Sequence, residues 1–214
     1  MHNFIDPILV LVLLLNFVAL GASRLRTDIQ AVSAQGVLLG LTIILAHGAP
    51  MEPLVVAMAV TTAALKGVVI PRMLFNAIRE VVIRREVEPI VGFIASIFLG
   101  AAGTALAVLF SKSLPIAPSD AGSLIVPAAL STVLTGFLIL TTRTKAITQV
   151  VGYLILENGV FIFGMLLMKA IPFLVELGVL LDLFVAIFVM GIIIHKISRE
   201  FDTVSTRMLS ELKE

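Results

Sequence analysis

Long apolar runs dominate this sequence, and their length constrains the fold more than any other feature. A helix rises about 1.5 Å per residue, so roughly 20 apolar residues cross the ~30 Å hydrocarbon core of a bilayer. Runs of this kind lie at about 5–22, 29–47, 53–77, 89–111, 123–141, 146–169 and 172–196. They do not alternate between polar and apolar residues as the strands of a membrane β-barrel do. The sequence therefore predicts an all-α, integral membrane bundle of about seven transmembrane helices.

The composition agrees with a membrane protein and excludes several kinds of chemistry. Hydrophobic residues make up 59% of the chain and charged residues only 14%, about half the usual share in a soluble domain. Without cysteine, the chain offers no disulfide and no thiolate for catalysis or ordinary iron–sulfur ligation. His2, His47 and His195 lie far apart near predicted helix ends, so no pair is placed to hold a haem. We therefore expect no cofactor and no metal in the chain itself.

Basic residues are distributed unevenly among the predicted connections, and this bias orients the bundle. The first, third and fifth connections and the C-terminal tail hold twelve of them, namely Arg24, Arg26, Arg72, Arg79, Arg84, Arg85, Arg143, Lys145, Lys196, Arg199, Arg207 and Lys213. The connections on the other side hold only Lys112 and Lys169. Because loops rich in lysine and arginine stay in the cytoplasm, we expect the N-terminus outside and the C-terminus in the cytoplasm. No lysine or arginine precedes Arg24, so the N-terminal run is predicted to be a retained helix rather than a cleaved signal.

Small residues recur at helical spacing in two of the predicted spans. The fourth span carries a stripe that repeats every four residues, made of Gly92, Ser96, Gly100 and Thr104. The second span carries the pair Gly36 and Gly40, a GxxxG spacing. Such residues let helices approach closely in lipid, where close packing drives association. The stripes are about as likely to hold this bundle together as to form a seam for a partner subunit.

We single out four ionisable residues within the predicted spans: Lys66, Glu157, Glu176 and Asp182. A charge at a helix centre costs on the order of 2.5–3.5 kcal/mol, so such groups are expected to face the protein interior or water, to pair, or to be neutral. Glu157 and Asp182 fall near mid-membrane, and Lys66 falls somewhat inside the midplane. Glu176 lies close to the outer end of its span, where a glutamate soon after Pro172 also suits the positive end of the helix dipole.

The surroundings of these residues leave two interpretations open. Pro71, which follows Lys66 by five residues, lacks an N–H for the preceding turn and is expected to kink the span near that lysine. Glu157 is followed by an amide, Asn158, and has Tyr153 one turn earlier, where the phenol is placed to hydrogen-bond to the carboxyl group. The mid-depth groups either exchange protons or ions, or form a structural ion pair. We favour translocation, because one lysine cannot neutralise two acids.

Three segments carry a resemblance to a known family. The segments VGYLILENGVFIFGMLL, FLVELGVLLDLFVAIFVMGIIIHKI and TTAALKGVVIPRML resemble the hydrogenase-4 component E family, and the resemblance extends over most of the chain. Its members are membrane subunits of group 4 respiratory and formate-linked hydrogenase complexes. The last three spans are also similar to the K-type subunit of respiratory complex I and the C-type subunit of Mrp antiporters. K-type subunits carry two membrane glutamates; Glu157 matches the first, and Asp182 stands in for the second, with Glu176 as the competing candidate.

The resemblance implies a non-catalytic, multi-pass subunit of the prokaryotic plasma (inner) membrane. It would lie beside antiporter-like and complex-I-H-like subunits and help couple electron transfer to proton or sodium movement, with no nucleic-acid partner. It divides the chain into a four-helix region at 1–122, a complex-I-K-like region at 123–197 and a cytoplasmic tail at 198–214. The alternatives are a scaffold that only seats larger subunits, and an independent ion transporter, which the lack of an inverted repeat disfavours.

Overall fold

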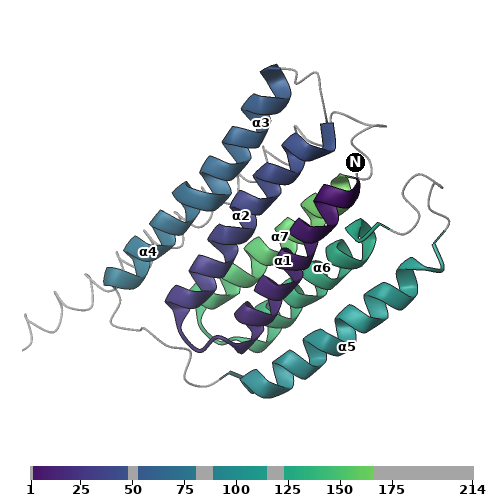
Figure 1. Cartoon of the computed structure of the whole chain (residues 1–214). Coiled ribbons are helices and arrows are strands. Elements are labelled where there is room, and N and C mark those ends of the chain that lie inside the picture. Colours follow the sequence, from purple (N-terminus) through teal and green to yellow (C-terminus); the bar gives the residue numbers. More distant parts are fainter. Residues whose placement is uncertain (1, 48–52, 81–88, 115–122, 166–214) are drawn as a thin grey trace, which may run out of the picture.

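Every regular element in the described part of the chain is a helix. The computed structural model describes residues 2–47, 53–80, 89–114 and 123–165. The elements are α1 (His2–Gly21), α2 (Leu25–His47), α3 (Pro53–Ala64), the π-helical turn η1 (Leu65–Val69), α4 (Ile70–Glu80), α5 (Phe93–Ser111), α6 (Ile125–Thr142) and α7 (Ala146–Gly164). Because α3, η1 and α4 follow one another without a break, they form a single rod (Figure 1).

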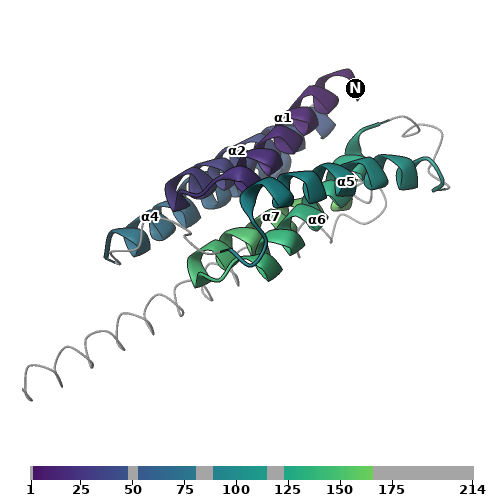
Figure 2. The ribbon, with the colours of Figure 1, turned by 90° about the horizontal axis from the view of Figure 1, so that it is seen from below.

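The helices are arranged in two layers. Helices α1, α2 and the α3–α4 rod lie side by side in one layer, and α5, α6 and α7 form the second (Figures 1 and 2). Between the layers, α1 packs against α5 and α6, and α2 packs against α7. Apolar side chains fill the interface, including Leu20, Ile29, Ile70, Ile139 and Ile155. The second layer therefore brings α7 next to α2, close to the middle of the rod.

Glycines set the spacing between neighbouring helices. A Cβ atom at Gly36 would lie 2.6 Å from the backbone carbon of Lys66, and one at Gly40 would lie 2.7 Å from the Cβ of Ala63. In the α6–α7 seam, a Cβ atom at Gly159 would lie 2.6 Å from the Val133 nitrogen. The GxxxG pair of α2 thus packs against the α3–α4 rod of its own chain, which resolves the alternative of a partner seam for these two residues.

The small-residue stripe of α5 also faces its own bundle, except at its first position. Ser96 is fully buried, and a Cβ atom at Gly100 would clash with the Leu20 side chain. The Thr104 and Ser131 hydroxyl groups form a 2.6 Å hydrogen bond that links α5 to α6. A Cβ atom at Gly92, by contrast, would meet nothing within 4 Å. Three of the four stripe residues therefore seat α5 against α1 and α6.

Arg143 joins three segments at one end of the bundle. Its guanidinium group donates to the carbonyls of Val91, at 3.0 Å, and of Leu20, at 2.9 Å. It also lies over the Phe93 ring, 4.7 Å from the ring centroid. The side chain is only 1% exposed. Arg143, counted above among the loop charges, is thus a buried connector between the ends of α1 and α6 and the segment that leads into α5.

The structure contains six of the predicted spans, with ends that differ from the predicted ones by a few residues. Of the described helices, five are long and apolar enough to cross a membrane: α2, the α3–α4 rod, α5, α6 and α7. Residues Ile5–Gly21 of α1 form a shorter apolar helix. The seventh span, at 172–196, lies outside the described residues. The membrane orientation and the domain boundaries stay predictions.

Candidate functional site

Lys66 lies in the π-helical turn η1, where the hydrogen-bond pattern of the rod changes from α-helical to π-helical. The N–H of Ile70 donates to the carbonyl five residues earlier, as in a π-helix. Pro71 follows and has no N–H to give to the carbonyl of Gly67. The hydroxyl of Ser33, on α2, donates to that carbonyl instead, at 2.5 Å. The helix is therefore irregular at Lys66 in the form of a π turn, a feature that is frequent at functional sites, and the kink at Pro71 stays a prediction.

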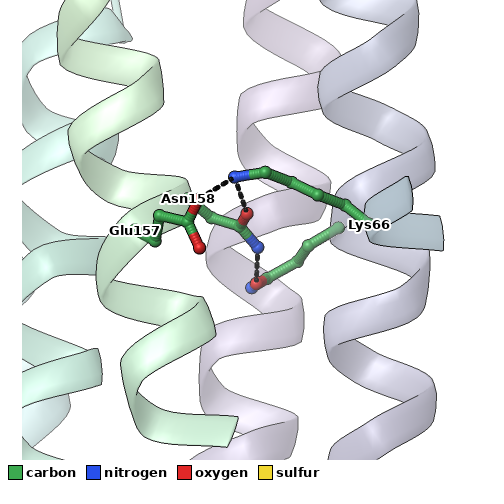
Figure 3. A network of polar contacts seen from close by, with 4 residues as sticks. Lys66, Glu157 and Asn158 are labelled. Atoms are coloured by element: carbon green, nitrogen blue, oxygen red, sulfur yellow. Dashed lines mark hydrogen bonds and ion pairs between the residues drawn. The ribbon is translucent and has the colours of Figure 1, made fainter. Parts of the chain in front are cut away.

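The Lys66 ammonium group is buried against α7. Figure 3 shows its side chain extending from the rod toward Glu157 and Asn158. Nζ lies 3.2 Å from Glu157 Oε1 and donates to Asn158 Oδ1, also at 3.2 Å. The ammonium also lies 5.4 Å from the centroid of the Phe161 ring, within the range of a cation–π contact. Lys66 is 4% exposed and Glu157 5%, so the two charged groups meet in the protein interior.

The two oxygens of the Glu157 carboxyl group have different surroundings. Oε1 pairs with Lys66, whereas Oε2 is buried and has no hydrogen-bond partner among the described residues. Among the described residues, Tyr153 does not form the hydrogen bond to Glu157 that the sequence predicted, so this prediction is wrong. The Tyr153 side chain instead packs, half-buried, against the apolar cluster between α1, α2 and α7. A carboxylate with one unsatisfied buried oxygen is costly, and a proton on that oxygen would reduce the cost.

Four uncharged polar residues extend the pair across the bundle. Asn158 Nδ2 donates to Gln35 Oε1 on α2, at 3.2 Å. Gln35 Nε2 then donates to Asn16 Oδ1 on α1, at 2.8 Å, and more weakly to the Val12 carbonyl, at 3.4 Å. Asn16 Nδ2 donates to Thr132 Oγ1 on α6, at 2.9 Å. The site is therefore a continuous buried network that links η1, α7, α2, α1 and α6.

The sequence interpretation missed Gln35, Asn16 and Thr132, although a signal for two of them was present. Asn16 and Gln35 each stand inside an apolar run, in LLLNFVAL and AVSAQGVLL. A carboxamide in lipid needs partners for the same reason that a charge does, since no water is present to satisfy it. Searching the spans for amides as well as for charges would have found both residues. Threonine is too common in membrane helices for Thr132 to stand out.

Two of the predicted site residues, Asp182 and Glu176, lie outside the described residues. The structure therefore neither brings them to the Lys66–Glu157 pair nor separates them from it. Within the described ranges, no group of three or more histidine, aspartate or glutamate side chains is arranged to hold a metal ion.

The comparisons with known proteins give one extensive relationship and one partial similarity. The chain is 31% identical over 193 residues to the uncharacterized protein Rv0085 of Mycobacterium tuberculosis, a match that covers 89% of this chain and 87% of the mycobacterial protein. The chain belongs to the family of that protein. It is also 34% identical over 85 residues to hydrogenase-4 component E of Escherichia coli K12 and of Shigella flexneri. No protein-family model and no solved structure matches it.

The similarity to hydrogenase-4 component E covers less of the chain than expected. It spans 40% of this chain and 39% of component E, whereas the resemblance was expected to extend over most of the chain. The five long apolar helices support a multi-pass membrane protein, and the comparisons support a distant relation to a hydrogenase component. Its buried lysine–glutamate pair provides a carboxyl group that can take up a proton and a cation that can balance the charge when the proton leaves.

Proposed function

We propose that the chain is a non-catalytic membrane subunit of a hydrogenase-like respiratory complex, in which Glu157 and Lys66 take part in moving protons or sodium ions. The buried pair is the observation that carries this proposal. Placing ionisable side chains inside a membrane costs free energy, and residues of this kind usually have a function. The partial similarity to hydrogenase-4 component E supplies the context. In that context, electron transfer takes place in other subunits, and antiporter-like and complex-I-H-like subunits are the neighbours of this chain in the plasma membrane.

The unequal surroundings of the Glu157 oxygens suggest how the pair works. Oε1 is held by Lys66, while Oε2 is the atom left to receive a proton. When Glu157 is protonated, Lys66 keeps Asn158 and the Phe161 ring as partners and stays in place. When the proton leaves, the ammonium group compensates the new negative charge at 3.2 Å. Asp182, or Glu176 in its place, would be the next exchanging group on the seventh span.

The substitution Glu157→Gln in the assembled complex tests this role. The amide keeps the size of the side chain and its contact with Lys66, but it cannot bind and release a proton. We expect electron transfer to continue or slow, with the number of ions moved per electron strongly reduced. Asp6→Asn is the matched control. Asp6 lies near the start of α1, where its carboxylate accepts the N–H of Leu124, and the side-chain oxygen of asparagine can accept the same bond. Wild-type pumping in the Glu157→Gln complex would rule out the proposal.

A scaffold role is the competing function, and the continuity of the polar network across five elements favours it. If the pair only joins helices, Glu157→Gln lowers the yield of assembled complex, yet each assembled complex pumps normally. Measuring ions per electron together with the yield of complex therefore separates the two functions.

A further inference from the structure

The hydrogen bonds that lead away from Lys66 all run in one direction. Lys66 donates to Asn158, Asn158 to Gln35, Gln35 to Asn16, and Asn16 to Thr132. Each carboxamide accepts on the side of Lys66 and donates on the side of Thr132. Each of the five residues lies on a different element, and all are buried.

The ammonium group explains this direction. An ammonium has three donors and no acceptor, so Asn158 must present its oxygen to Lys66. Its NH₂ group is then left to donate to Gln35, and the same constraint passes to Asn16 and Thr132. If Asn158 or Gln35 turned over alone, N–H would face N–H on one side and oxygen would face oxygen on the other. If Asn16 turned over alone, its N–H would face the N–H of Gln35. Each mismatch is costly in a buried site.

A neutral lysine would allow the opposite direction. An amine has a lone pair and can accept a hydrogen bond from the NH₂ group of Asn158. If all three carboxamides turned over together and the Thr132 hydroxyl donated instead of accepting, every link would again be satisfied. Gln35 would give up only its 3.4 Å bond to the Val12 carbonyl. The network thus has two satisfied arrangements, and mixed ones are penalised.

We propose that the chain of residues Lys66–Asn158–Gln35–Asn16–Thr132 is a two-state hydrogen-bond relay that carries the charge state of Lys66 to helix α6. Gln35 and Asn16 are positioning residues in this relay. The relay goes beyond the proposed function, because it requires only that Lys66 can change its charge and not that this chain moves ions. It ends on α6 beside α5, whose apolar face points away from the bundle.

Coupling between Lys66 and Thr132, whose side chains are separated by three carboxamides, tests the relay. We would measure the unfolding temperature of the purified full chain for Thr132→Val, both alone and in the Lys66→Gln/Glu157→Gln background. With Lys66 present, the direction is fixed and Asn16 loses the acceptor for its N–H, which should lower the unfolding temperature by roughly 2–10 °C. In the neutral background the amide at position 66 can donate or accept, so the three carboxamides can turn over together. Asn16 then presents its oxygen, instead of its N–H, to the side chain at position 132.

The relay predicts that the loss caused by Thr132→Val falls by half or more in the neutral background. Thr132→Ser, which keeps the hydroxyl, should restore the unfolding temperature. Thr135→Val is the matched control, because Thr135 is buried one turn further along α6 and lies outside the relay; its effect should be the same in both backgrounds. Equal losses for Thr132→Val in the two backgrounds would overturn the relay, whatever the result for ion pumping.

If the Lys66→Gln/Glu157→Gln variant does not fold, a direct measurement on the unmodified protein tests the relay. In lipid, solid-state NMR should connect the side-chain N–H protons of Asn158 to the Gln35 carboxamide carbon. A correlation of those protons with Lys66 Nζ while the lysine is charged would contradict the fixed direction.

Discussion

Helices α5 and α7 have the same length but opposite surroundings. Each spans 19 residues, yet only 11% of the α5 span is buried inside the protein, against 50% of the α7 span. The exposed face of α5 carries large apolar residues such as Phe98, which is 72% exposed. The buried face of α7 carries Glu157 and Asn158. The polar side chains of α7 thus lie in the interior, whereas α5 turns large apolar side chains outward, as expected where lipid is the solvent.

The comparison teaches where sequence changes should be tolerated. On α5, one apolar side chain can replace another as long as lipid or an apolar partner surrounds it. On the buried face of α7, residues such as Glu157, Asn158 and Gly159 contact specific neighbours, so the tolerance there is low. The predictions below test this contrast from the largest expected effect to the smallest.

The largest loss of stability should follow Lys66→Met. This change leaves the Glu157 carboxylate buried without its cation, which typically costs about 3–5 kcal/mol. Thermal unfolding of the purified chain measures the effect. The double variant Lys66→Met/Glu157→Gln should recover much of the loss, because the unpaired charge is gone. A double variant no more stable than Lys66→Met would mean that the ion pair is not the source of the cost.

A smaller loss should follow Gly159→Ala. Replacing a glycine by alanine inside a helix normally stabilises it by up to about 1 kcal/mol, but here the new methyl group meets the α6 backbone at Val133. Separating the two helices should cost about 1–3 kcal/mol, visible in the same unfolding assay. Gly164→Ala, on the same helix, is the control, because its Cβ atom would meet nothing within 4 Å. If both variants are equally stable, the α6–α7 seam is looser than the structure indicates.

The smallest effect should follow Phe98→Ala. An exposed side chain loses little on truncation, so the stability of the purified chain should change by no more than about 0.5 kcal/mol. Measuring how the same variant associates with other membrane subunits tests what covers the exposed face of α5. If Phe98→Ala weakens association with other membrane subunits while the chain itself stays stable, the face of α5 is covered by protein and not by lipid.

Much of the helical architecture could be predicted from the sequence, because the length of an apolar run and the charge of its flanks depend on local composition. Six of the predicted spans are present as helices, and Lys66 and Glu157 were selected because they are charged residues inside apolar runs. Their contact could not be predicted, since it depends on how the α3–α4 rod and α7 pack across α2. The role of Arg143 was missed for the same reason: a basic residue in a short connection is equally compatible with solvent and with buried carbonyl groups.

The polar network shows a second limit of sequence reasoning. Composition identified the charges, which are few, but it gave no ground for joining Gln35 to Asn158, 123 positions apart. That link requires α2 and α7 to be neighbours across the two layers. The glycines that bring α2 close to the rod were recognised as a packing stripe, while their partner helix was known only from the structure.

The proton state of Glu157 during turnover tests the central claim most directly. Infrared difference spectroscopy of the assembled complex, comparing reduced and oxidised states, detects the carbonyl band of a carboxyl group that gains or loses a proton. We predict a band that changes between the two states, shifts on hydrogen–deuterium exchange and is absent in the Glu157→Gln complex. Identical difference spectra for the wild-type and Glu157→Gln complexes would show that Glu157 keeps one protonation state throughout, and the pair would then be structural.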